Sequence, residues 1–191
     1  NQYTMDAVSY LDGSFGMILG VLVSLIVINL VRAISPDTSA TRILALHYQA
    51  MRQALHLPYG SDFKIHLRSM LDRVGVLNTK MVQNPEIKTA IQNALVESSS
   101  IVDLVRLQEI SQKLPQMVEL QQEVNALQQQ LTAYFQAQEK QLSIHHFPAE
   151  IVQQIARLQR IAPQIEDAQL RQRLLISLNN ICESIGHIST E

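Results

Sequence analysis

The chain has 191 residues, which is enough for one or two domains with a buried core. With 47% hydrophobic and 5% aromatic residues, no Trp, and only six Gly and six Pro, the composition excludes a turn-dense β fold and predicts an all-α protein. The formal net charge of -2 excludes the basic surface that nucleic-acid binding needs, and the single cysteine, Cys182, excludes an internal disulfide.

The first predicted element is a long apolar helix. From Phe15 to Val31 there is no charged residue, and only Ser24 and Asn29 have polar side chains. A helix from Phe15 to Ile34 would be about 30 Å long, close to the hydrocarbon thickness of a bilayer. A buried soluble helix would need a polar stripe, and a signal peptide would need basic residues before its apolar core. We therefore expect a transmembrane helix with a short leading segment in residues 1–34, with the lipid bilayer as its surroundings.

The distribution of charge predicts the orientation of this helix. All 15 Lys and Arg residues follow Val31, whereas the leading segment carries only Asp6 and Asp12. Because positive charges accumulate on the cytoplasmic side of a membrane, residues 35–191 are expected in the cytoplasm. The chain begins with Asn1 and not with Met, so we also expect that it is a piece of a longer protein.

Small residues recur along one face of the apolar helix. Gly16, Gly20 and Ser24 are four residues apart, a spacing that lets another membrane helix approach closely. We expect these three residues to pack against further membrane helices. For Asn29, near the cytoplasmic end, an interhelical hydrogen bond is favoured over a role in lining a substrate path.

The remainder, residues 35–191, reads as an antiparallel bundle of five to seven helices joined by short turns. Pro36 is expected to end the apolar helix, and Asp37, Thr38 or Ser39 to cap the next one. Turns at "LPYG", "NPE", Pro115 and "HHFP" separate the later helices. The predicted helices are Ser39 to Leu57, Asp62 to about Gln83, a third helix that follows "NPE" at 84 to 86 and runs to about Gln112, a helix with the seam from Met117 to Tyr134, about Ala149 to Ala162, and Gln164 to Ile188.

One segment also fits a coiled coil. Met117, Leu120, Val124, Leu127, Leu131 and Tyr134 follow a 3, 4, 3, 4, 3 spacing. A helix of the intramolecular bundle is favoured over a dimerising coiled coil. If this seam were exposed, the chain would be a single-pass, membrane-anchored adaptor for another protein, which is our alternative to the function inferred below.

The residues give no sign of catalysis. There is no G-x-x-x-x-G-K-[ST] loop, G-x-S-x-G elbow or H-E-x-x-H pair, so we predict no enzyme activity, cofactor or metal site. His145 and His146 are adjacent and favour a solvated loop over metal binding. His47, His56, His66 and His187 are isolated on predicted helices, where surface or core positions are favoured over catalysis.

One segment near the start of the chain reads "YLDGSFGMILGVLVSLIVINLVRAISPDTSATRILALHYQAMRQAL". It resembles the fusaric acid resistance or aromatic acid exporter family of bacterial inner-membrane efflux pumps. In that family an aromatic residue with Leu-Asp opens the last membrane helix, Gly recurs inside it, and "LVR" closes it. The matching positions are Tyr10 to Asp12, Gly16, Gly20, and Leu30 to Arg32. The resemblance is closest over about residues 8 to 57.

The resemblance implies that the chain is the C-terminal part of an exporter of aromatic carboxylic acids or related toxic compounds, driven by the proton gradient. It implies as partners the other membrane helices of the transporter, a periplasmic membrane-fusion protein and, in a homo-oligomer, further copies. Asp12 matches the family pattern and is the one candidate for proton coupling. From the residues alone, an N-cap of the helix is favoured for Asp12.

Overall fold

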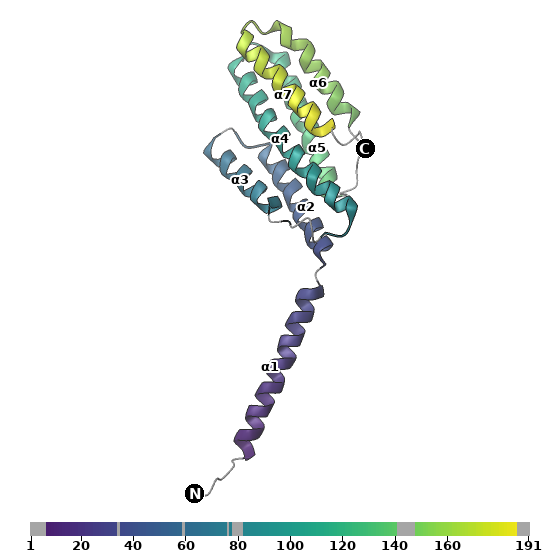
Figure 1. Ribbon diagram of the computed structural model, residues 1–191. Coiled ribbons are helices and arrows are strands. Elements are labelled where there is room, and N and C mark those ends of the chain that lie inside the picture. Colours follow the sequence, from purple (N-terminus) through teal and green to yellow (C-terminus); the bar gives the residue numbers. More distant parts are fainter. Residues whose placement is uncertain are drawn as a thin grey trace.

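A computed structural model describes residues 7–33, 35–58, 60–75, 77, 82–140 and 148–186 (Figure 1). Within these ranges the chain forms α-helices and one 3₁₀ turn and contains no strand, which confirms the predicted all-α class. The elements are α1 (Ala7–Ala33), α2 (Pro36–Ala54), α3 (Ser61–Gly75), α4 (Pro85–Lys113), α5 (Val118–Lys140), α6 (Ala149–Ile161), the 3₁₀ turn η1 (Ala162–Gln164) and α7 (Ala168–Gly186).

Helices α2 to α7 form a bundle in which α2 packs on α3, α4 and α5, while α7 packs along α4 and α6 along α5. Two contacts between α2 and α5 show in which direction each of these two helices runs. The Gln128 amide on α5 donates to the Leu55 carbonyl at the end of α2, and further along the pair the ring of Tyr48 meets that of Phe135. Residue numbers therefore rise on α2 as they fall on α5, as an antiparallel pair requires.

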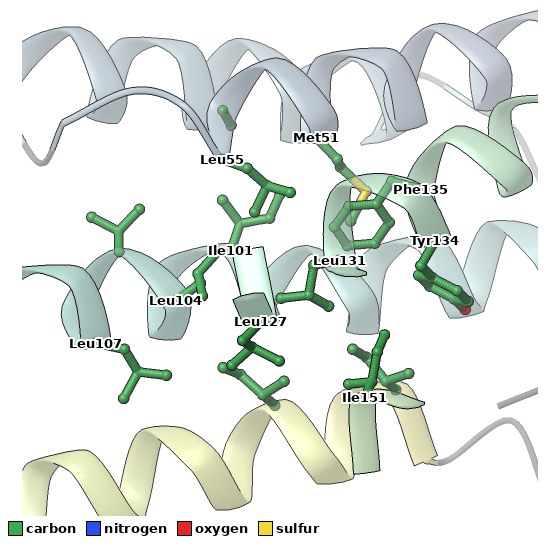
Figure 2. Packing of buried hydrophobic residues seen from close by; sticks show 14 of the residues in the cluster. Met51, Leu55, Ile101, Leu104, Leu107, Leu127, Leu131, Tyr134, Phe135 and Ile151 are labelled. Carbon is green, nitrogen blue, oxygen red and sulfur yellow. The ribbon is translucent and has the colours of Figure 1, made fainter. Parts of the chain in front are cut away.

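The core of the bundle contains the seam that the sequence singled out. Leu120, Val124, Leu127, Leu131 and Tyr134 are buried, and Met117 packs partly buried against them. Figure 2 shows Leu127 and Leu131 of α5 inside the cluster, with Met51 of α2 against Phe135. The preference for a bundle helix is thus confirmed. The seam is not an exposed face for a partner, so the adaptor alternative loses the surface that motivated it.

Several helix boundaries differ from the predicted ones because capping groups were misassigned. Ser35, before Pro36, is the N-cap of α2, and its Oγ accepts the Thr38 N–H at 3.1 Å. Asp37 instead accepts the N–H groups of Gln83 and Asn84 with Oδ1, which ties the start of α2 to the start of α4. Helix α2 therefore begins three residues before the predicted Ser39.

Two later helices are shorter than predicted. Helix α3 ends at Gly75 and not near Gln83, in agreement with the low helix propensity of glycine. Pro163 lies in η1, and α7 begins only at Ala168, because the Asp167 carboxylate caps it by accepting the N–H groups of Gln169 and Leu170.

Helix α1 projects away from the bundle as a single long helix (Figure 1). It begins at Ala7, so Asp12 lies in its second turn and cannot be its N-cap; that interpretation is wrong. No helix in the described ranges meets the length and hydropathy expected of a segment that crosses a membrane.

Truncating the α5 seam tests its place in the core. Leu127 is 0% exposed, whereas Val118 on the same helix is 57% exposed. We expect Leu127→Ala to lower the free energy of unfolding by about 2 to 5 kcal/mol, because it removes buried apolar contacts and leaves a cavity. The matched Val118→Ala variant should change it by less than about 0.5 kcal/mol in denaturant unfolding. Equal effects of both variants would contradict the packing of α5.

Candidate functional site

The surface of α1 is apolar and uncovered. Every large hydrophobic side chain from Phe15 to Ile28 is more than half exposed, and no described helix of the bundle packs on this stretch. Along the same stretch the Ser24 hydroxyl donates to the Gly20 carbonyl at 2.8 Å, so this polar group is satisfied within its own helix. A helix of this kind is compatible with an apolar environment around its whole circumference.

The small-residue strip lies on this uncovered helix. A methyl group added at Gly16 or Gly20 would meet no atom within 4 Å, so in this chain the strip faces open space. Asn29 is exposed near the other end of the helix. The backbone of Asp12 belongs to α1, but its side chain lies outside what the structure describes. The packing and transport roles of these residues stay predictions.

The bundle contains a buried cluster of polar side chains that the sequence did not predict. Glu97 of α4 is 1% exposed and lies between α2 and α5. The Tyr134 hydroxyl on α5 donates to its Oε1 at 2.6 Å, and the Tyr48 hydroxyl on α2 also hydrogen-bonds the carboxyl. Its other oxygen, Oε2, is buried without a hydrogen-bond partner. We call Glu97, Tyr48 and Tyr134 the carboxyl junction.

The electrostatics of the carboxyl junction are set by burial. Removal from water raises the pKa of Glu97 to about 7, and the hydrogen bonds from Tyr134 and Tyr48 lower it only in part. Burial also raises the pKa of both tyrosines, and the nearby Glu97 carboxylate adds to this shift, so both phenols stay protonated donors. The carboxyl junction can therefore hold or release one proton near neutral pH.

A buried histidine lies beside the carboxyl junction. Nε2 of His47 is 3.0 Å from the Ser98 hydroxyl and 3.3 Å from the Ala94 carbonyl, which can only accept, so Nε2 carries the proton. Nδ1 has no partner, and burial lowers the pKa of the ring. His47 is thus a neutral core histidine, the favoured interpretation of the isolated histidines.

The described residues contain no group of three His, Cys, Asp or Glu side chains that could hold a metal ion. His145, His146 and His187 lie outside the described ranges. The sequence did hold one signal for the carboxyl junction: Ala94, Glu97, Ile101 and Leu104 follow the spacing of a buried helical stripe, so Glu97 occupies a core position.

Structure and sequence together define a helical bundle attached to a helix with an uncovered apolar surface. Comparison with protein families matches residues 1–190 to the Fusaric acid resistance protein family. The chain belongs to this family, which confirms the resemblance noted in the sequence, and membership indicates a role in membrane transport. Neither the curated proteins nor the solved structures gave a match.

Removing one donor tests the carboxyl junction. In Tyr134→Phe the Glu97 carboxyl loses its 2.6 Å hydrogen bond while the ring stays in the core. We expect a loss of about 1 to 3 kcal/mol in the free energy of unfolding, because a buried polar group loses a partner.

The control is Thr132→Val on the same helix, which removes a hydroxyl that donates to the Gln128 carbonyl one turn away. It should cost less than Tyr134→Phe in the same denaturant unfolding experiment. A Tyr134→Phe variant as stable as the parent protein would show that the hydrogen bond to Glu97 contributes nothing.

Proposed function

We propose that this chain is the C-terminal part of a bacterial inner-membrane efflux transporter that exports aromatic carboxylic acids or related toxic compounds. In this proposal α1 is the last membrane helix, and the bundle in residues 35–191 lies in the cytoplasm. The observation that carries it is the family match over residues 1–190, together with the apolar surface of α1 that the chain does not cover itself.

The side chains of α1 support its place in the bilayer. Its uncharged run in the sequence extends from Gly13 to Val31, and Arg32 follows directly. A lone apolar helix in water would expose all of this surface, whereas lipid or neighbouring helices remove it from water. The cationic side chains of the chain all follow this run, which favours a cytoplasmic bundle.

The proposed partners follow from the same helix. Gly16, Gly20 and Ser24 form a surface on which further membrane helices of the transporter can pack closely, because small side chains let helix backbones approach and a methyl group at Gly16 or Gly20 would meet open space. Asp12 and Asn29 lie on the same helix, and we propose Asp12 for proton coupling. A periplasmic membrane-fusion protein and a homo-oligomeric assembly complete the proposal.

Export is tested in bacterial cells with the full-length gene. We expect deletion to raise the accumulation of labelled 4-hydroxybenzoate and to lower the growth-inhibitory concentration of the acid, with both restored by the intact gene. Collapse of the proton gradient by a protonophore should abolish the difference between the strains. Asp12→Asn should reduce export at an unchanged protein level if Asp12 takes part in proton coupling.

Equal accumulation in deleted and complemented cells, over a panel of aromatic acids, would contradict the proposed substrate class. Export by Asp12→Asn at the parent rate would remove Asp12 from the mechanism and leave the transporter assignment intact.

Membrane packing is tested by enlarging one position of the strip. In Gly20→Leu the large side chain should force the packed helices apart, so we expect less assembled complex and greater protease sensitivity in membranes. Val23→Leu is the matched control, because Val23 is already a large exposed apolar residue on α1 and lies off the strip. Assembly of Gly20→Leu at the level of Val23→Leu would contradict the packing role.

A further inference from the structure

Glu97 is placed where three helices meet. It extends from α4 between the hydroxyls of Tyr48 on α2 and Tyr134 on α5, and it is almost completely removed from solvent. Both neighbours act as donors to the carboxyl, while Oε2 has no partner. Each change in the charge of this group therefore acts on the packing of three elements at once.

Within the part of the chain that the structure describes, no Lys or Arg forms an ion pair with Glu97. From α2 it faces Tyr48, and His47 on the same helix is neutral and directed at Ser98; from α5 it faces Tyr134. Burial raises its pKa, and the hydrogen bonds of Tyr134 and Tyr48 oppose this shift. A buried carboxylate without a counter-ion is strongly unfavourable, whereas the neutral acid is tolerated.

We propose that Glu97 is a proton-binding site of the bundle, at which the protonated carboxyl keeps α2 packed against α4 and α5 and loss of the proton loosens this packing. When Glu97 loses its proton, the O–H bond of the carboxyl breaks and the proton passes to water. No other covalent bond changes. The proposal concerns the bundle alone and does not depend on the transported compound.

The sign of the effect follows from the direction of the shift. The pKa of Glu97 is raised from 4.5 in an unperturbed side chain to about 7 in the fold. Its contribution to stability is fully present below pH 4.5 and is lost as the pH rises to about 7. The full shift corresponds to a roughly 300-fold fall in the folding equilibrium constant from well below pH 4.5 to well above pH 7.

His47 acts in the opposite direction, because its pKa is lowered in the fold and its neutral form is the stabilising one. The pH profile of the parent protein alone is therefore not diagnostic. The difference between the parent and Glu97→Gln isolates the carboxyl, since His47 is present in both. Glu86→Gln, on the exposed start of α4, is the control for loss of one glutamate.

The experiment uses the full chain in detergent micelles. The unfolding equilibrium is measured between pH 4.5 and pH 8 for the parent, Glu97→Gln and Glu86→Gln, and hydrogen exchange of α2, α4 and α5 is compared at pH 6 and pH 8 after correction for intrinsic rates. In the parent protein, ¹³C-labelled glutamate carboxyl signals are titrated by NMR.

We expect the stability of the parent relative to Glu97→Gln to fall on the order of 100-fold between pH 4.5 and pH 7, with Glu86→Gln following the parent. One carboxyl signal, assigned to Glu97, should titrate near neutral pH, and exchange in α2 and α5 should rise in the same transition. A pH-independent difference, or a Glu97 signal that titrates near 4.5, would overturn the proposal. If Glu97→Gln fails to fold, the titration of the Glu97 carboxyl signal in the parent protein decides, because this signal reports on the carboxyl itself and not on His47.

Discussion

The packing of α2 against α4 and α5 is the interaction on which the rest of the structure depends. Its buried face carries Leu44, Tyr48 and Met51, which lie in the centre of the core. Through Asp37 the same helix fixes the start of α4, and through Leu55 its end is held by Gln128 of α5. Since α2 is also the helix that follows α1, it connects the apolar helix to the bundle.

The bundle and α1 differ in whether their apolar side chains are buried. The bundle buries its apolar residues among its own helices, from Ala40 on α2 to Ile185 on α7. Helix α1 leaves its large apolar side chains from Phe15 to Ile28 exposed, because they cover its circumference and no described helix of the bundle packs on them. Exposed apolar surface of this extent is typical of sites that interact with other proteins or with membranes.

The carboxyl junction shows how a polar group is retained inside this bundle. A hydrophobic residue at position 97 would pack without the cost of removing a carboxyl from water. The fold instead supplies two phenol donors from different helices, Tyr48 and Tyr134, and leaves one carboxyl oxygen unpartnered. Burial favours the neutral acid over the carboxylate, so the protonation of such a group links the packing of three helices to the proton concentration.

The sequence by itself determined the helical class, the apolar α1, the buried seam from Leu120 to Tyr134 and the family, because these depend on composition, periodicity and a contiguous motif. Helix ends such as Ser35 and Asp167 were missed, since several nearby polar residues could cap equally well and only the backbone geometry selects one. The carboxyl junction was decided by the tertiary structure, because Glu97 meets Tyr48 and Tyr134 only when three segments distant in the chain pack together. The periodicity of α4 could place Glu97 in the core, but it could not supply the two donors that hold it there.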